Sequence, residues 1–226
     1  MTDRRAAVRE AYDDIGYGYA DRRDDEPPEL PLLAELLDRV PDGARVLDAG
    51  CGPGTPIARA LAERVDVLGV DVSREQLRVA TEAVPAGRFL QGDMTRLPLA
   101  TGSAAGVVAM HSVIHVPTEK HERVLGEFAR VLSPGGALLL SSGTAAFEGT
   151  NQDWLGDGVP MHWSYPDPTE TEAMLGEAGF TVVETWTVGD GFADAGEKWV
   201  ALAAAGTDHG GSATTKRGSR QAGLDG

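Results

Sequence analysis

Cysteine, lysine and long apolar runs are scarce in this 226-residue chain. Cys51 is the single cysteine, so no disulfide can form within the chain. No apolar run approaches the roughly 20 residues that a membrane helix needs. The opening MTDRRAAVREAYDD is charged throughout, unlike a secretory signal peptide. We therefore expect a cytoplasmic protein, and its length favours one well-buried domain over two.

Positive charge is also in short supply. The chain has 35 acidic residues against 20 basic ones and a formal net charge of -15. Nucleic acids and anionic membranes are bound by positive surfaces, so neither is an expected partner. Only Lys120, Lys198 and Lys216 are lysines, a pattern that resembles proteins of high-salt cytoplasm and equally acidic proteins from GC-rich genomes. If the first interpretation holds, thermal stability rises between low and molar KCl, because salt screens the self-repulsion.

The chain contains a regular alternation of short β-branched runs and amphipathic segments of helix length. The predicted strands are 45–49, 66–71, 87–91, 105–111, 136–142, 180–188 and 198–205, and the predicted helices between them are 56–64, 74–83, 119–132 and 169–178. This alternation predicts a parallel sheet with helices on both faces. The loop VGDGFADAG before the last strand is too short for a crossover helix, so the last two strands should pair antiparallel.

The two ends of the chain differ from this core, which we place at residues 44–205 with an insertion at 143–167. Residues 1–43 should form a helical segment, with one helix ending near Gly16 and another over PELPLLAELLDRV. Residues 206–226 have almost no bulky apolar side chain and are rich in Gly, Ser and Thr, so we expect a disordered tail.

A glycine-rich turn, RVLDAGCGPGTP, follows the first predicted strand. Such a turn lets the backbone approach a ligand closely, and the free N–H groups of a following helix favour anionic groups. Thr55 suits the N-cap and Pro56 the first turn of that helix. The dinucleotide pattern G-x-G-x-x-G is not matched in either register, because Thr55 or Ile57 occupies the third glycine position.

The turn instead reads Asp48-x-Gly50-x-Gly52-x-Gly54. This resembles the first motif of class I S-adenosylmethionine-dependent methyltransferases of the small-molecule type (methyltransferase domain 11/25-like). Further landmarks of the family follow in order: VLGVD, FLQGDMTRLPL, VLSPGGALLLSS and EAGF. The resemblance implies a Rossmann-like three-layer α/β sandwich whose seven-stranded, mostly parallel sheet has the order 3-2-1-4-5-7-6, with strand seven antiparallel. It also implies S-adenosylmethionine (SAM) as cofactor and S-adenosylhomocysteine (SAH) as product.

The resemblance assigns cofactor contacts as well. Asp71 ends the second strand, where a carboxylate can accept hydrogen bonds from both ribose hydroxyls. Asp93 can accept from the adenine amino group, and Met94 can lie against the ring. The full expected set is Tyr19, Asp48, Ala49, Gly50, Gly52, Gly54, Asp71, Val72, Asp93, Met94 and His111.

Transfer of a sulfonium methyl mostly needs positioning and exclusion of water, so a general base is optional. The candidates directly after strand four are His111 and His115. We favour a wall of the cofactor site for His111, with a base as the alternative, and a structural role for His115, with a substrate contact as the alternative. Tyr19 is a second catalytic candidate. No third ligand accompanies the two histidines, so no metal is expected.

Two segments outside the shared pattern should select the methyl acceptor. The opening AYDDIGYGYADRRDD is similar to tyrosine-bearing lids of related methyltransferases and carries Tyr12, Tyr17 and Tyr19. We expect the insertion 143–167 to be an unusually long, aromatic loop, which is typical of a substrate cover, although its aromatics could also pack on the sheet edge. Its candidate contacts are Trp154, His162, Trp163 and Tyr165. Such a cover suits a small apolar or aromatic acceptor with an O, N or C nucleophile.

Two other functions stay open. An NAD-dependent oxidoreductase is disfavoured by the missing third glycine and by the lack of a Tyr-x-x-x-Lys pair. A catalytically silent SAM-binding sensor or accessory subunit would show the same cofactor residues as an enzyme. The sequence is compatible with a monomer or a homodimer.

Overall fold

The computed structural model describes residues 4–22, 24–156, 158–189 and 196–206, although not the side chain of Tyr17. The expected disordered tail, apart from Gly206, and most of the loop VGDGFADAG lie outside these residues. Among the described residues, no helix is both long and apolar enough to cross a bilayer.

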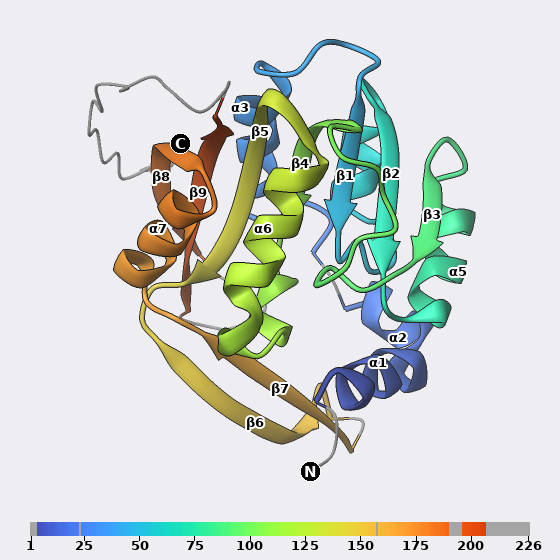
Figure 1. Ribbon diagram of the computed structural model, residues 1–226. Helices are drawn as coiled ribbons and strands as arrows, with labels where there is room; N and C mark the ends of the chain where they lie inside the picture. The colour runs from blue at the N-terminus through green and yellow to red at the C-terminus, as the bar shows by residue number, and fades with distance from the viewer. Residues whose placement is uncertain (1–3, 23, 157, 190–195, 207–226) are drawn as a thin grey trace, which may run out of the picture.

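A seven-stranded sheet forms the centre of the molecule (Figure 1). In spatial order its strands are β3 (Arg88–Gln91), β2 (Asp66–Asp71), β1 (Arg45–Ala49), β4 (Ala104–Ala109), β5 (Leu132–Gly143), β9 (Glu197–Ala205) and β8 (Phe180–Gly189). The first five are parallel, and β9 runs antiparallel to both β5 and β8. The predicted strand order and the antiparallel terminal pair are therefore confirmed.

Helices cover both faces of the sheet, as the alternation predicts. The α-helices are α1 (Arg4–Ile15), α2 (Tyr17–Ala20), α3 (Leu33–Leu37), α4 (Ile57–Leu61), α5 (Arg74–Ala83), α6 (His121–Val131) and α7 (Pro168–Glu177), and the short 3₁₀ helices are η1 (Leu30–Leu32), η2 (Val113–His115) and η3 (Thr118–Lys120). Ser73 caps α5 by accepting from the Gln76 amide, and Asp167 caps α7 in the same way with Glu170.

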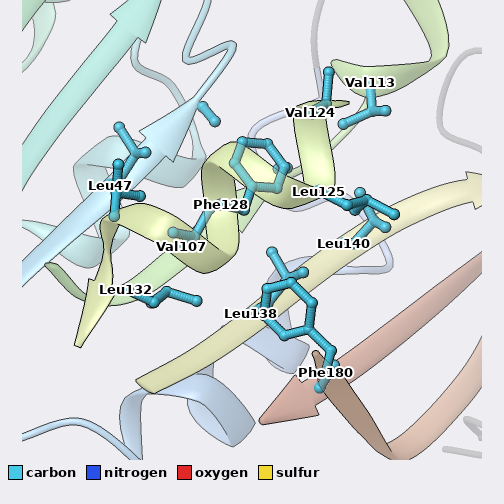
Figure 2. Packing of buried hydrophobic residues seen from close by; sticks show 14 of the residues in the cluster. Leu47, Val107, Val113, Val124, Leu125, Phe128, Leu132, Leu138, Leu140 and Phe180 are labelled. Carbon is cyan, nitrogen blue, oxygen red and sulfur yellow. The ribbon is translucent and has the colours of Figure 1, made fainter. Parts of the chain in front are cut away.

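Two apolar clusters hold these layers together. On one face Phe128 of α6 is fully buried among Val107, Leu138 and their neighbours, as Figure 2 shows. On the other face α3 and α4 pack on the same strands through side chains such as Leu36 and Leu61. The central strands lie between these two clusters and are buried on both faces. Their sequences are therefore nearly continuous apolar runs.

Beyond the carboxyl ends of the parallel strands lie α1 and a second, two-stranded sheet (Figure 1). This antiparallel hairpin consists of β6 (Phe147–Trp154) and β7 (Val159–Tyr165). The insertion at 143–167 was expected to be a long loop, and this was wrong. Tyr165 stacks on Phe147 and Met161 pairs with Asn151, so cross-strand contacts fix the register up to Asn151, and it shifts before Trp154.

The start of α4 also differs from expectation. Helix α4 begins at Ile57, its N-cap is Pro56, and no side chain makes a capping hydrogen bond there. Thr55 precedes a cis peptide bond to Pro56 and is not the N-cap. The turn is held by backbone bonds instead, with the Gly54 N–H donating to the Cys51 carbonyl at 3.0 Å.

Candidate functional site

The glycine turn has the backbone conformation that only glycine adopts easily. Gly50, Gly52 and Gly54 all have positive φ, at 78°, 51° and 77°. A Cβ at Gly50 would lie 2.2 Å from the Cβ of Ser112, so no side chain fits there. Gly54 faces away from the turn's hollow, and a Cβ on it would come within 3.2 Å of Ala80 in α5. Gly50 therefore lets the turn pack closely against Ser112, and Gly54 lets helix α5 approach.

Asp71 ties this turn to the end of β2. Its Oδ2 accepts from the Gly52 N–H at 2.9 Å and its Oδ1 from the Ser73 N–H at 2.8 Å. Burial raises the pKa of Asp71, and these backbone hydrogen bonds oppose that shift. Ala49 pairs with Val70 across the two strands, so the residues that follow each lie at one edge.

A hollow of about 860 Å³, counting its open mouth, lies at this edge, and we call it the loop cavity. Its walls include nine of the predicted cofactor or substrate residues: Tyr19, Gly50, Gly52, Asp71, Val72, Asp93, Met94, His111 and His115. Tyr19 lies over the turn, since a Cβ on Gly52 would be 3.7 Å from its ring. Asp48 and Ala49 are buried in β1 behind the turn and, like Gly54, do not line the cavity.

Asp93 lines the loop cavity. Its Oδ1 accepts from the Thr95 N–H at 2.9 Å, and its Oδ2 is paired with the guanidinium of Arg5 from α1. Burial would raise the pKa of Asp93, but the Thr95 amide and Arg5 outweigh it and lower that pKa. Arg5 thus links the N-terminal helix to the expected adenine end. Sequence patterns gave no sign of this contact.

A second hollow of about 1060 Å³, also counting its mouth, adjoins the first, and we call it the aromatic cavity. It shares Tyr12, Tyr19, His111 and His115 with the loop cavity. Its other walls include Phe147, Trp154, Trp163, Tyr165 and Lys198. The rings meet edge to face, with centroids 5.5 Å apart for Tyr12 and Trp154 and 5.9 Å for Trp154 and Trp163. The hairpin and α1 therefore enclose one aromatic space together.

His162 does not line this space. It lies on β7, and its Nδ1 is 2.7 Å from the hydroxyl of Thr150 on β6. Its backbone carbonyl is the part that faces the site, because it lies 3.0 Å from Nδ1 of His115.

His115 is neutral because it is buried, and two neighbours fix which of its ring nitrogens carries the proton. The His162 carbonyl can only accept, so Nδ1 of His115 carries the proton, and Nε2 then accepts from the Tyr12 hydroxyl at 3.0 Å. Burial lowers the pKa of His115 to about 4. The ring thus joins α1, η2 and β7 in one hydrogen-bonded chain at the boundary of the two cavities.

His111 belongs to a buried cluster of charged side chains. Its Nε2 lies 2.5 Å from Oε1 of Glu29 and 2.9 Å from Nζ of Lys198, and Nζ lies 3.1 Å from Oε2 of Glu29. Burial would raise the pKa of Glu29, but His111 and Lys198 outweigh it and lower that pKa to about 2. Glu29 and Lys198 were not among the predicted site residues. A rare lysine in an apolar strand was the available signal.

The residues of the loop cavity fit the cofactor that the motifs imply. Among the described residues, the buried hydroxyl of Ser112 has no hydrogen-bond partner, although it lies beside the Gly50 backbone. Asp71 presents carboxylate oxygens at the end of β2, where the ribose hydroxyls are expected. Met94 and Val70 supply apolar surface for a flat ring. Ser112 is therefore a further candidate contact that the sequence patterns did not single out.

Sequence comparisons agree with this geometry. Residues 46–136 match the family model described as a methyltransferase domain. An O-methyltransferase from Pyrenophora dematioidea is 31% identical over 207 residues, which cover 81% of this chain and 73% of that protein. The methyltransferase GfsG from Streptomyces halstedii is 35% identical over 146 residues, or 57% of this chain, and the chain spans only half of that relative's length.

Comparison with solved structures shows a shared fold. The crystal structure of magnesium protoporphyrin IX methyltransferase from Synechocystis PCC 6803, with bound SAH, has a TM-score of 0.69 and 18% identity, and the match covers 90% of this chain and 100% of that one. The motif order, the strand order with its antiparallel β9 and the relative matched over most of its length all agree. The chain belongs to the class I family of methyltransferases whose cofactor is S-adenosylmethionine.

Proposed function

We propose that this protein transfers a methyl group from SAM to a small-molecule acceptor bound in the aromatic cavity. The observation that carries the proposal is that the loop cavity and the aromatic cavity share a wall made of Tyr12, Tyr19, His111 and His115. A cofactor in the first hollow and an acceptor in the second would meet at that wall.

The chain's own residues would hold the cofactor as follows. The glycine turn and Ser112 face its amino acid part, Asp71 its ribose, and Asp93 with Met94 its adenine. When bound, SAM supplies an activated methyl group on a positively charged sulfur. What the protein adds is alignment of the acceptor and exclusion of water. The hairpin and α1, which cover the carboxyl edge of the sheet, suit that task.

The acceptor we propose is small, planar and largely apolar. The aromatic cavity offers ring faces from Trp154, Trp163 and Tyr165, and its boundary carries His111 and Tyr19 as candidate catalytic groups. The Pyrenophora relative is named an O-methyltransferase, which supports an oxygen nucleophile among the O, N and C candidates. His115 acts in this proposal as a neutral wall that positions Tyr12. The proposal also keeps a cytoplasmic location, no nucleic-acid or membrane partner, and a monomer or homodimer.

Calorimetry with SAM, SAH and NAD tests the cofactor. We expect micromolar binding of SAM and SAH. Binding of NAD without binding of SAM would overturn the proposal. A methyl-transfer screen with SAM over small aromatic acceptors, read by mass spectrometry, then tests for turnover.

Two tryptophan variants test the acceptor cavity. Trp154→Ala and Trp163→Ala should weaken acceptor use at least tenfold, because each removes a ring face, while SAM affinity stays nearly intact. Leu90→Ala, an exposed apolar residue on β3 outside both cavities, serves as the control. Equal loss of acceptor use and SAM affinity would contradict the assignment of this hollow to the acceptor.

A further inference from the structure

Three ionisable side chains, those of Glu29, His111 and Lys198, lie together in a buried cluster. We call them the charge cluster. Their side chains are 0%, 13% and 6% exposed, and the three atom pairs between them are 2.5, 2.9 and 3.1 Å apart. They come from the start of η1, the turn after β4 and the start of β9, so 169 residues separate the ends of the set.

Stability does not explain the cluster. Taking charges out of water costs about as much as their attraction returns, so apolar residues of similar volume serve a core as well or better. The backbone of His111 has a φ of 53°, a conformation that a residue with a side chain seldom adopts and that is common at functional sites. The cluster also opens onto ligand space, because His111 lines both cavities and Lys198 lines the aromatic one.

The proton balance of the cluster points to a chemical role. Glu29 stays ionised, because its pKa is about 2, and the Lys198 ammonium balances its charge. His111 beside the Glu29 carboxylate can therefore accept one proton, which leaves the cluster with one net positive charge. Among the described residues, the other titratable side chains that line the aromatic cavity are Tyr12, Tyr19, neutral His115, Tyr165 and Glu197.

We propose that the charge cluster selects and activates an acceptor with an acidic hydroxyl group, such as a phenol or an enol. This inference rests on the proposed function and narrows its acceptor. His111 takes the proton of the hydroxyl, Lys198 stabilises the resulting oxyanion, and Glu29 positions both groups. The oxygen's electron pair forms the new bond to the methyl carbon, while the electron pair of the broken carbon–sulfur bond stays on sulfur. His111 then returns its proton to solvent.

An ammonium acceptor fits this wall poorly. It would approach Lys198, and its proton would add a second positive charge to the same buried site. The surrounding rings can contact a planar hydroxyl compound or a planar amine equally well. Discrimination between these two acceptors therefore depends on the charge cluster. An acceptor oxygen with a pKa near neutrality gains most, because it can lose its proton to an imidazole.

Two coloured probes of equal size test the proposal by binding alone. The ionised form of 4-nitrophenol has its own visible absorption band, whereas 4-nitroaniline has the same ring and cannot form an oxyanion. We expect the protein, alone and with SAH, to bind 4-nitrophenol with its pKa lowered by about one unit, which is a tenfold preference for the phenolate. It should bind 4-nitroaniline at least tenfold more weakly. Unchanged ionisation of the phenol, equal binding of the aniline or no binding of either probe would overturn the proposal.

Variants assign the effect to individual groups. Lys198→Met should abolish the shift of the probe, and Lys198→Arg should restore part of it. Glu29→Gln should reduce it as well. If Lys198→Met fails to fold because Glu29 is left as an uncompensated buried charge, the double variant Glu29→Gln/Lys198→Met replaces it, since it removes both charges together. Glu127→Gln, which removes a carboxylate that is paired with Arg130 and lines neither cavity, should leave the shift unchanged. A shift retained in folded Lys198→Met would contradict the role of the ammonium.

SAM binding and phenolate preference, measured on the same protein, separate the failure of this inference from the failure of the proposed function. A pH profile then tests the role of Lys198 in catalysis. If wild-type protein binds SAM but shows no preference for the phenolate, only the inference fails. If it binds no SAM, the proposed function fails first. For any hydroxyl acceptor found in the screen, Lys198→Met should move the acidic limb of kcat/KM upward in pH and leave SAM affinity unchanged. A merely structural contact would lower activity equally at every pH.

Discussion

Replacement of Gly50 by alanine tests the reasoning about the glycine turn most directly. The new Cβ would lie 2.2 Å from the Cβ of Ser112 and 3.3 Å from Cε of Met94, and φ at this position is +78°. Gly43 provides a matched control, because its φ is +72° and nothing lies within 4 Å of its would-be Cβ. The two variants share the cost of a left-handed residue and differ in the steric clash.

The expected magnitudes follow from these two terms. A left-handed conformation costs an L-residue about 1–2 kcal/mol. Overpacking of a tightly filled region costs about 1–3 kcal/mol more. Gly43→Ala should therefore lower the free energy of unfolding by about 1–2 kcal/mol, and Gly50→Ala by about 2–5 kcal/mol. Because relief of the clash must move either the turn or Ser112, SAM affinity should fall more than tenfold in Gly50→Ala alone.

Urea unfolding measures the stability of both variants, and calorimetry with SAM measures binding. Equal stability losses for the two variants, together with unchanged SAM affinity in Gly50→Ala, would refute a role of the close Gly50–Ser112 contact in shaping the SAM site.

Three further predictions concern single side chains. Asp71→Asn should weaken SAM binding at least tenfold by calorimetry, because an amide nitrogen must face either the Gly52 or the Ser73 N–H, whereas Asp66→Asn at the other end of β2 should not. His115 is neutral in the folded protein down to about pH 4, so the unfolded state binds its proton first, and stability should fall by about 3 kcal/mol as pH drops from 6.5 to 4. Urea titrations of the wild type and His115→Gln should show a flatter dependence in the variant; identical slopes would contradict this. Burial raises the pKa of the Cys51 thiol, so a thiol reagent should label it only after unfolding, and rapid labelling of native protein would refute its burial.

The parallel core was readable from sequence because its signals are local. Apolar runs mark β1, β2, β4 and β5, and a loop too short for a helix marks the antiparallel pair β8 and β9. The glycine turn was readable for the same reason, since its backbone conformation is set by three neighbouring glycines. The position of Asp71 then follows from strand register, because Ala49 pairs with Val70.

The hairpin β6–β7 was missed although a weak signal was present. Met161, Trp163 and Tyr165 alternate with less apolar residues, as a strand requires, but the opposite strand carries Glu148, Asn151 and other polar side chains. A polar strand looks like a loop until its partner is known. The stabilising contacts here are cross-strand pairs and the packing of Met161 against α1, neither of which is local in sequence.

The charge cluster is the part of the site that the sequence did not predict. Glu29 lies among other acidic residues that are typical of an exposed segment, and Lys198, although one of only three lysines, stands near the start of a strand, where a charge is common. Only the fold brings them against His111, because β9 enters the sheet beside β5 and the start of η1 approaches the same wall. The cofactor half of the site is thus made mostly of residues close in sequence to the parallel strands, with Arg5 and Tyr19 added from the N-terminal helices. The acceptor half is assembled from four separate segments, namely the N-terminal helices, the turn after β4, the end of β5 with the hairpin, and the start of β9. Related chains can therefore keep the first half and replace the second independently.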